Sequence, residues 1–471
     1  MPGVPTRPSL FNRLGLDRPE LRAWAMYDWA ISAVQTTIMV AVFPIYFIAI
    51  SADSLSESGA TQALANAHIL IAVVVAVLSP ILGAISDYAG IKKKMLAVAM
   101  VPGLLALSGM FFVQHGDYQV ARALFIVVLI SATASVVFYE SLLPHIAPQQ
   151  EMDRVSSAGY ALGYLGGGVL LAINLAWIIA PQAFGLPAGD GLTRSQATLP
   201  TRLAFLSVAV WWLLFAIPLF RRVKEPPRTL EPDERVGESV FITPFRRLYE
   251  TLRELRRFKN AFLMLVAFMI YNDGIQMIQK MAAAYGSVIG IDNSALITAL
   301  LIVQFVGVPF AFLFGGLAAR VGAKRMVLAG LAVYTCISIF GYFIATATHF
   351  FILATLTGMV QGGTQALSRS LFARMIPAHK SGEFFGFYSV FEKFAGIFAP
   401  LVFSLVIGAT GHPRNAIFSL ILFFVIGAVI LLFVDVDEGE RVARDAERGL
   451  HRAREAGDEP EAPSAPTTIP A

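Results

Sequence analysis

The chain has 471 residues, of which 56% are hydrophobic and only 14% are charged, and its formal net charge is +4. Soluble domains carry about 25% charged residues, so this composition excludes an ordinary soluble enzyme or binding domain and indicates a membrane protein. The single cysteine, Cys336, lies in an apolar run and excludes a disulfide within the chain.

Twelve apolar stretches of the chain are long enough to cross a bilayer as helices. Each covers about twenty residues or more, and none shows the alternation of a barrel strand, so we predict an all-α membrane protein. In chain order, the predicted spans are residues 25–50, 68–86, 95–113, 120–146, 155–181, 203–220, 259–288, 294–318, 326–347, 349–376, 383–410 and 415–436.

Basic residues lie mainly in the segments on one side of this predicted topology. An excess of Lys and Arg in short loops marks the cytoplasmic side of a membrane protein, so both termini are predicted to be cytoplasmic. We expect a multi-pass protein of the cell membrane, specifically of a bacterial inner membrane. The opposite side holds only four basic residues, which are Arg122, Arg194, Arg202 and Arg414.

The two halves of the chain repeat each other. "GAISDYAGIKKK" (83–94) follows the second span, and "GGLAARVGAKR" (315–325) follows the eighth. A repeat of six spans in the same orientation predicts two pseudo-symmetric bundles around a central path. An offset of 232 residues places Gly83 on Gly315, Gly90 on Gly322, Lys92 on Lys324 and Lys93 on Arg325.

This repeat predicts four regions. Residues 1–220 form the first six-helix bundle, and residues 259–437 form the second. Residues 221–258 form a cytoplasmic linker that ends in an amphipathic helix on the membrane surface. The polar tail, residues 438–471, is expected to be cytoplasmic and disordered.

The loop after the second span resembles the signature loop of the major facilitator superfamily. It reads Gly-x-x-x-Asp-x-x-Gly-x-Lys-Lys, with Gly83, Asp87, Gly90, Lys92 and Lys93 at the marked positions. The resemblance implies twelve helices in two six-helix bundles, and a loop that acts as a latch on one access state. The aspartate position is Ala319 in the second copy, so a latch there is expected to be weaker or differently made.

Four longer stretches resemble the Atg22-like group of this superfamily, also called the UMF1 family, which includes vacuolar effluxers of amino acids. They are "WAMYDWAISAVQTTIMVAVFPIYF" (24–47), "SSAGYALGYLGGG" (156–168), "YNDGIQ" (271–276) and "GGTQALSRSLFARMIP" (362–377). The resemblance implies that the first and seventh spans line the central path and that the protein works as a monomer.

Several charged side chains lie within the predicted spans. A charge near the bilayer centre costs about 2.5–3.5 kcal/mol, so each needs a partner or a watery cavity. Asp273 and Lys280 are seven residues apart and share a helical face with Gln276. The charged residues within spans are Asp28, Glu140, Asp273, Lys280, Arg369, Glu392 and Lys393.

These residues are the candidates for the solute and proton path. Asp28, Gln35 and Thr36 of the first span are predicted to face Asp273, Gln276 and Lys280 across a cavity between the halves. The alternative for Asp273 is a carboxylate that packs helices together, and the alternative for Asp28 is a side chain that reaches cytoplasmic water.

Three further charges are assigned more local roles. Arg369 and Glu392 lie at similar depths on adjacent spans and predict an ion pair, which either lines the path or only locks two helices. Glu140, near Arg374, is expected to act as a gate or brace.

In the fifth span, the glycines at 159, 163 and 167 predict close contact with a partner helix.

Together these features predict a secondary active transporter that exports a small polar solute, amino acids or related metabolites, by alternating access linked to protons. No P-loop, catalytic constellation or metal-ligand spacing is present, so we expect no enzyme activity, no cofactor, no metal and no nucleic-acid partner. The expected partners are the solute, protons and the lipid bilayer. A multidrug or cell-wall-fragment permease of the same superfamily and a non-transporting membrane receptor or scaffold remain alternatives.

Overall fold

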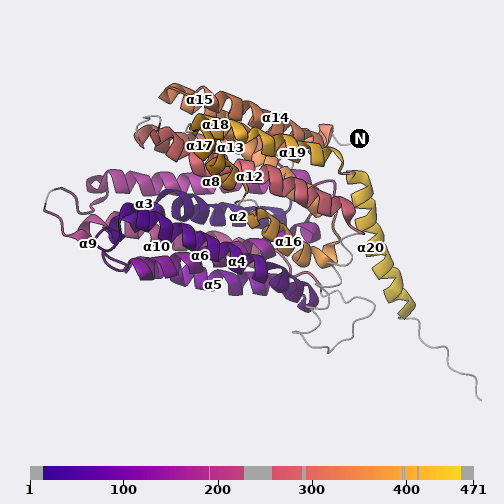
Figure 1. The fold of residues 1–471 in the computed structure, drawn as a ribbon. Helices are drawn as coiled ribbons and strands as arrows, with labels where there is room; N and C mark the ends of the chain where they lie inside the picture. The colour runs from indigo at the N-terminus through magenta and orange to yellow at the C-terminus, as the bar shows by residue number, and fades with distance from the viewer. Residues whose placement is uncertain are drawn as a thin grey trace, which may run out of the picture.

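The computed structural model describes residues 14–189, 191–227, 257–288, 293–394, 396, 398–410 and 413–457. Within these ranges the ordered elements are all helices, and they lie side by side in an elongated bundle (Figure 1). The predicted all-α fold is therefore confirmed. Of the cytoplasmic linker predicted at 221–258, residues 228–256 lie outside the described part of the chain.

The helices follow one another in two halves of the chain. The first half contains α2 (Pro19–Ala33), η1 (Val34–Ala41), α3 (Phe43–Ser51), α4 (Glu57–Ala89), α5 (Lys92–Met110), α6 (Tyr118–Ser141), α7 (Leu143–Ile146), α8 (Met152–Ile179), η2 (Pro181–Phe184), α9 (Arg194–Ala197) and α10 (Leu199–Arg222). The second half contains α12 (Lys259–Val288), α13 (Asn293–Val321), α14 (Ala323–Tyr342), α15 (Ala347–Arg374), η3 (Ala378–Lys380), α16 (Ser381–Phe394), α17 (Phe398–Thr410), α18 (Pro413–Ser419), α19 (Ile421–Leu432) and α20 (Val436–Gly457).

Each predicted span falls on a helix or on a broken pair of helices. Among the described residues, nine helices are long and apolar enough to cross a membrane, or ten if the bent pair Pro19–Ala41 and Phe43–Ser51 counts as one. The tenth predicted span is α15, whose later part is polar and includes Gln361, Gln365 and Arg369. The eleventh is divided between α16 and α17.

The first span is broken in its middle. After α2, residues Val34–Ala41 form a π-helix, and the chain then bends by 40° into α3. Pro44, in the first turn of α3, has no N–H to donate to the carbonyl of residue 40, so the regular helical ladder cannot continue. The Val42 N–H donates instead to the Thr37 carbonyl at 2.8 Å, five residues back.

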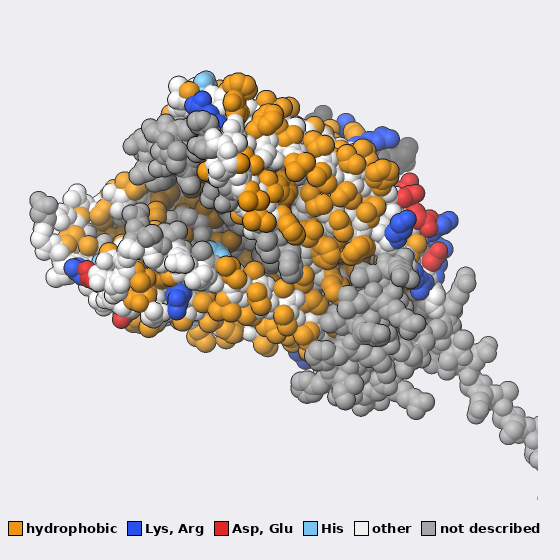
Figure 2. Space-filling view, viewed as in Figure 1, with side chains coloured by type: hydrophobic (Ala, Val, Ile, Leu, Met, Phe, Trp, Pro, Cys, Tyr) orange, Lys and Arg blue, Asp and Glu red, His pale blue; other side chains and the backbone are white. Residues whose placement is uncertain are grey.

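The surface of the bundle matches a lipid environment. Hydrophobic side chains cover its flanks, and charged side chains gather at the end where α20 lies (Figure 2). Large apolar residues such as Ile45, Leu105 and Leu405 are exposed. We call the end with α20 the α20 end and the opposite end, where α3 and α9 lie, the α9 end (Figure 1).

The two halves are closed against each other at the α20 end. There α4 packs on α16, and α8 packs on α13 and α15. A Cβ atom on Gly83 would lie 2.2 Å from the Gly382 carbonyl oxygen, and one on Gly315 would lie 2.5 Å from Ser157 Cβ. The halves therefore approach too closely for larger side chains. Toward the α9 end, the face in Figure 2 is hollowed between them.

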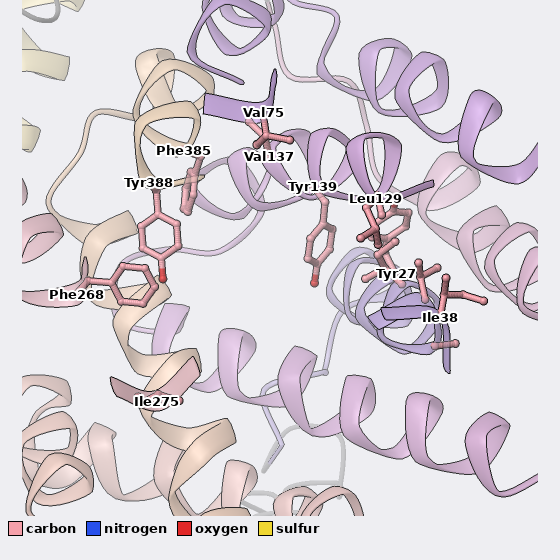
Figure 3. Packing of buried hydrophobic residues seen from close by; sticks show 14 of the residues in the cluster. Tyr27, Ile38, Val75, Leu129, Val137, Tyr139, Phe268, Ile275, Phe385 and Tyr388 are labelled. Carbon is pink, nitrogen blue, oxygen red and sulfur yellow. The ribbon is translucent and has the colours of Figure 1, made fainter. Parts of the chain in front are cut away.

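Aromatic and aliphatic side chains pack together in the interior of both halves (Figure 3). In the first half, the rings of Tyr27 and Tyr139 lie 4.9 Å apart, centroid to centroid. In the second half, the rings of Phe268 and Tyr388 stack at 4.4 Å. These contacts anchor the helices that carry the buried charges described below.

The tail does not begin as a disordered segment. Residues Val436–Gly457 form α20, so the prediction of disorder is wrong for 438–457, and residues 458–471 lie outside the described part. The helix is polar, but ion pairs at helical spacing support it, as between Arg441 and Glu438 at 2.5 Å and between Arg444 and Glu440 at 3.5 Å.

Candidate transport site

A buried arginine joins the two halves. Arg369 of α15 is 1% exposed, and its Nη2 lies 3.2 Å from Oδ2 of Asp28 on α2. Its Nη1 lies 3.7 Å from Oε1 of Glu140 on α6. One guanidinium of the second half is thus shared by two carboxylates of the first half, an arrangement that offsets the cost of burying the charge.

Hydrogen bonds fix the position of these charges. Arg369 Nε donates to Ser156 Oγ, and Nη2 donates to the Ser156 carbonyl, both at 2.9 Å. Ser156 Oγ in turn donates to the Ala366 carbonyl at 2.7 Å. On the other side, the Tyr139 hydroxyl donates to Asp28 Oδ2 at 2.7 Å. The guanidinium is therefore held by α8 as well as by the two acids.

Three aromatic rings surround the guanidinium. Its central carbon lies 4.4 Å from the ring centroid of Tyr160, 4.9 Å from Trp24 and 5.8 Å from Tyr139. Cation–π attraction adds to the ion pairs at such distances. Tyr160 is half-buried, whereas Trp24 and Tyr139 are fully buried. We call Trp24, Asp28, Tyr139, Glu140, Ser156, Tyr160 and Arg369 the Arg369 cluster.

The glycine stripe of α8 makes room for this cluster. A Cβ atom on Gly159 would lie 2.4 Å from Asp28 Oδ2 and 3.0 Å from Arg369 Nη2. One and two turns further along, Gly163 and Gly167 lie against Ser32 and Thr36 in the same way. The predicted helix contact of this stripe is confirmed, and its partner is the first span.

The other first-span candidates lie in the π-helix. Gln35 is exposed, and Thr36 is half-buried. Thr36 Oγ1 donates to the Ser32 carbonyl at 3.0 Å and to the Gly167 carbonyl at 3.3 Å. π-helical segments often occur at functional sites. This one follows α2, which carries Asp28 of the Arg369 cluster.

The seventh-span candidates lie elsewhere. Asp273 is 1% exposed, and its Oδ2 accepts a hydrogen bond from the Ala399 N–H at 2.8 Å. Ala399 is in the first turn of α17, so Asp273 caps a helix of its own half, which is the packing role left open above. Gln276 is half-buried, and the Lys280 side chain lies outside the described part.

Two predicted pairings differ from the structure. Among the described contacts, Arg369 forms ion pairs with Asp28 and Glu140, whereas the predicted partner is Glu392. Glu140 was placed near Arg374, but Arg374 lies 2.8 Å from Asp153 and 2.5 Å from Glu440. Depth along a helix can be read from a sequence, but the direction of a side chain around the helix axis depends on packing.

The signature loop is hydrogen-bonded across the two halves. Lys92 pairs with Asp87, and both side chains are buried. Asp87 Oδ2 also accepts from the Glu383 N–H at 2.9 Å, and Lys92 Nζ donates to Ser381 Oγ at 3.1 Å. The loop between α4 and α5 is therefore bonded to α16 of the other half.

The second copy of the loop makes a different contact. Lys324 Nζ donates to the Leu432 and Val434 carbonyls, both at 2.8 Å, as Lys93 does to the Phe220 carbonyl at 3.0 Å. Lys324 therefore matches Lys93, one residue away from the predicted pairing with Lys92. The second copy has alanine at the positions of both Asp87 and Lys92, so it cannot form this ion pair.

The aromatic walls of the Arg369 cluster were missed from the sequence. Trp24 precedes Asp28 by four residues, and Tyr160 follows Ser156 by four. Because residues four apart share a helical face, each ring lies beside the polar group that contacts Arg369. This spacing was a usable signal, but it depended on knowing that Asp28 and Ser156 face the same arginine.

The two halves, closed around a buried ion cluster, have the fold of the major facilitator class of membrane transporters. Transporters of this class are not enzymes. Residues 60–444 match the family described as Vacuole effluxer Atg22 like. Because this match covers more than half of the chain, the protein belongs to that family.

Individual relatives agree with this assignment. The chain is 35% identical over 430 residues to the uncharacterized MFS-type transporter YxiO of Bacillus subtilis, covering 90% of this chain and 96% of the relative. It is 28% identical to autophagy-related protein 22 of Yarrowia lipolytica, covering 62% of this chain and 51% of that relative, about half its length. The proton:xylose symporter XylE bound to 6-bromo-6-deoxy-D-glucose has the same fold, with a TM-score of 0.62, 15% identity and coverage of 92% and 98%.

Proposed function

We propose that this protein exports small amphoteric metabolites, amino acids foremost, in exchange for protons, with the Arg369 cluster at the solute site. The observation that carries the proposal is the ion pair between Arg369 and Asp28, 3.2 Å long, which joins the two halves. When the halves separate at the α20 end, this pair must break. A zwitterion can then replace it, with its carboxylate on Arg369 and its ammonium on Asp28.

The charge balance of the cluster supports proton coupling. Asp28 and Glu140 face one guanidinium, and the charge of Glu392 also acts on Glu140. Carboxylates thus outnumber Arg369 among the described groups of this cluster. A proton on one of them lowers the net charge that the closed, poorly hydrated state must hold, so protonation and closure support each other.

The direction of transport rests on sidedness and on the family. The excess of basic residues in the loops at the α20 end supports a cytoplasmic location for this end. In that orientation, the closed end of the bundle faces the cytoplasm. The family is described as vacuole effluxers, and this description favours efflux of the solute over uptake. We place the protein in the cell membrane as a monomer with both termini in the cytoplasm.

Transport in proteoliposomes tests the proposal. A thermal-shift screen against metabolites identifies the solute, and uptake of the labelled solute is then driven by an imposed pH difference. We expect Arg369→Ala to lose both exchange and pH-driven uptake. We expect Glu140→Gln to keep exchange but to lose pH-driven accumulation. Arg194→Ala, which removes an exposed ion pair with Asp53 at the α9 end, is the matched control and should behave like the parent.

The same assay separates the alternatives. Stronger competition by lipophilic cations than by amino acids would favour the multidrug permease, which the aromatic walls around Arg369 could also serve. Solute flux that is unaffected in Arg369→Ala would contradict the proposed site. No flux of any solute, with intact binding of a partner protein, would favour a receptor or scaffold.

A further inference from the structure

The last helix crosses the seam between the two halves. It leaves the final span and runs over the closed end of the bundle (Figure 1). Although α20 is highly charged, its Gly439, Glu440 and Ala443 are buried. A Cβ atom on Gly439 would lie 2.7 Å from Met375 Sδ, so the helix closely approaches the end of α15.

α20 is bonded to both halves. On the second half, Glu440 Oε1 lies 2.5 Å from Arg374, and Glu447 Oε1 accepts from the Ala378 N–H at 2.8 Å. On the first half, Arg444 Nη1 donates to Gln149 Oε1 at 2.9 Å. Gln149 in turn donates through Nε2 to the Arg374 carbonyl at 3.1 Å.

Arg374 extends this connection deeper into the first half. Its Nη1 lies 2.8 Å from Asp153 of α8, while Nη2 faces Glu440. The guanidinium of the second half therefore lies between an acid of the first half and an acid of α20. Loss of Glu440 removes one of the two acids that hold Arg374 in the position from which it reaches Asp153.

The joint is polar and incompletely filled. A cavity of about 290 Å³ lies where the two halves and α20 meet. It is lined by Pro144, Gln149 and Met152 of the first half, Ala373 and Ile376 of the second half, and Arg444 and Glu447 of α20. The joint is therefore loosely packed, and its direct polar contacts include those of Arg444 and Glu447.

We propose that α20 is a strap that holds the α20 end closed. Only residues 433–435 separate the helix from α19, so its contacts with the second half can persist when the halves separate. Its contact with Gln149, and the support of Arg374 against Asp153, exist only while the halves are together. The strap therefore stabilises the closed state selectively and sets the ratio of closed to open molecules. This equilibrium can be measured without knowing the solute, so the strap can fail its test while the proposed function stands.

Paired spin labels measure the equilibrium in the full-length protein in nanodiscs. Lys94→Cys in α5 and Arg320→Cys in α13 place exposed labels on different halves at the α20 end, in a Cys336→Ser background. We expect Arg444→Ala/Glu447→Ala, which removes both side-chain bonds, to raise the ratio of long to short label distances about tenfold, equivalent to about 1.4 kcal/mol. A chain that ends at Asp435 should shift the ratio in the same direction and at least as far.

The matched control is Glu438→Gln/Arg441→Ala. This variant removes the ion pair between Glu438 and Arg441 of the same helix, whose side chains are 39% and 66% exposed, respectively. It leaves the contacts between the two halves unchanged. We expect its distance distribution to equal that of the parent. The proposal is contradicted if Arg444→Ala/Glu447→Ala matches this control, or if this variant or the shortened chain shifts the distribution toward the short distance.

Discussion

Among single residues, Gly159 shows how closely the Arg369 cluster is packed. Replacing a helix glycine with alanine normally gains up to about 1 kcal/mol. Here the added methyl group would lie 2.4 Å from Asp28 Oδ2 and 3.0 Å from Arg369 Nη2. We expect Gly159→Ala to cost about 1–3 kcal/mol of stability through overpacking and to impair transport, as measured by thermal unfolding and solute exchange.

A matched glycine serves as the control. Gly316 on α13 is exposed, and a Cβ atom there would meet nothing within 4 Å. Gly316→Ala should therefore keep full transport and at least the parent's unfolding temperature. Equal behaviour of the two variants would mean that Asp28 and Arg369 do not need their present spacing.

The buried latch pair allows a second test on single residues. Lys92→Ala leaves the Asp87 carboxylate buried without its base, which costs about 3–5 kcal/mol. Asp87→Ala/Lys92→Ala reproduces the alanines of the second copy and should recover more than half of that loss, because no charge is left unpaired. Thermal unfolding of the two single variants and the double variant measures the coupling, and strictly additive effects would contradict it.

The charged residues themselves could be located from the sequence, but their partners could not. Asp28 and Arg369 were both recognised because a charge in an apolar run needs a reason. The two residues are 341 positions apart in the chain. Neither their spacing in the sequence nor their depth in the spans predicts that they pair. Asp273 was assigned to the cavity by helical periodicity, yet its hydrogen bond is made to α17 inside the same half.

Whole helices were predicted well where hydropathy is the dominant signal. The spans followed from apolar length, whereas the break in the first span depends on Pro44 and on local hydrogen bonding. α20 was missed because a polar segment after the last span has the composition of a disordered tail. Its order depends on tertiary contacts, such as those of Glu440 and Arg444, that composition does not encode.

The cap on α17 gives a prediction for a whole element. Asp273→Asn keeps an oxygen that can accept from the Ala399 N–H, so the helix should remain as stable as in the parent. Asp273→Ala removes the cap and should cost about 0.5–2 kcal/mol. Transport separates the remaining roles: loss of pH-driven uptake in Asp273→Asn, with exchange retained, supports Asp273 as a proton carrier. Unchanged pH-driven uptake contradicts that role and leaves helix capping.

For the whole molecule, closure at the α20 end has several supports. The signature loop bonds to α16, the Arg369 cluster joins α15 to α2 and α6, and α20 covers the seam. The signature loop uses α4, α5 and α16, whereas the Arg369 cluster and the α20 contacts both include α15 and α8. Alternating access requires that all of them break together, so each single contact must be weak enough for the closed and open states to remain close in energy.

A bulky side chain introduced where the two halves meet tests this closure. A Cβ atom on Gly382 would lie 2.7 Å from the Gly83 carbonyl oxygen and 2.8 Å from both carboxylate oxygens of Asp87. We expect Gly382→Leu to destabilise the closed state by about 1–3 kcal/mol, so the labels at 94 and 320 should report mainly long distances. Solute exchange should fall, because the cycle can no longer return through the closed state. Gly316→Leu, on the exposed side of α13, should leave both measurements at the parent's values. Short label distances in Gly382→Leu would mean that the seam tolerates a bulky side chain and that the contact of α4 with α16 is not what closes this end.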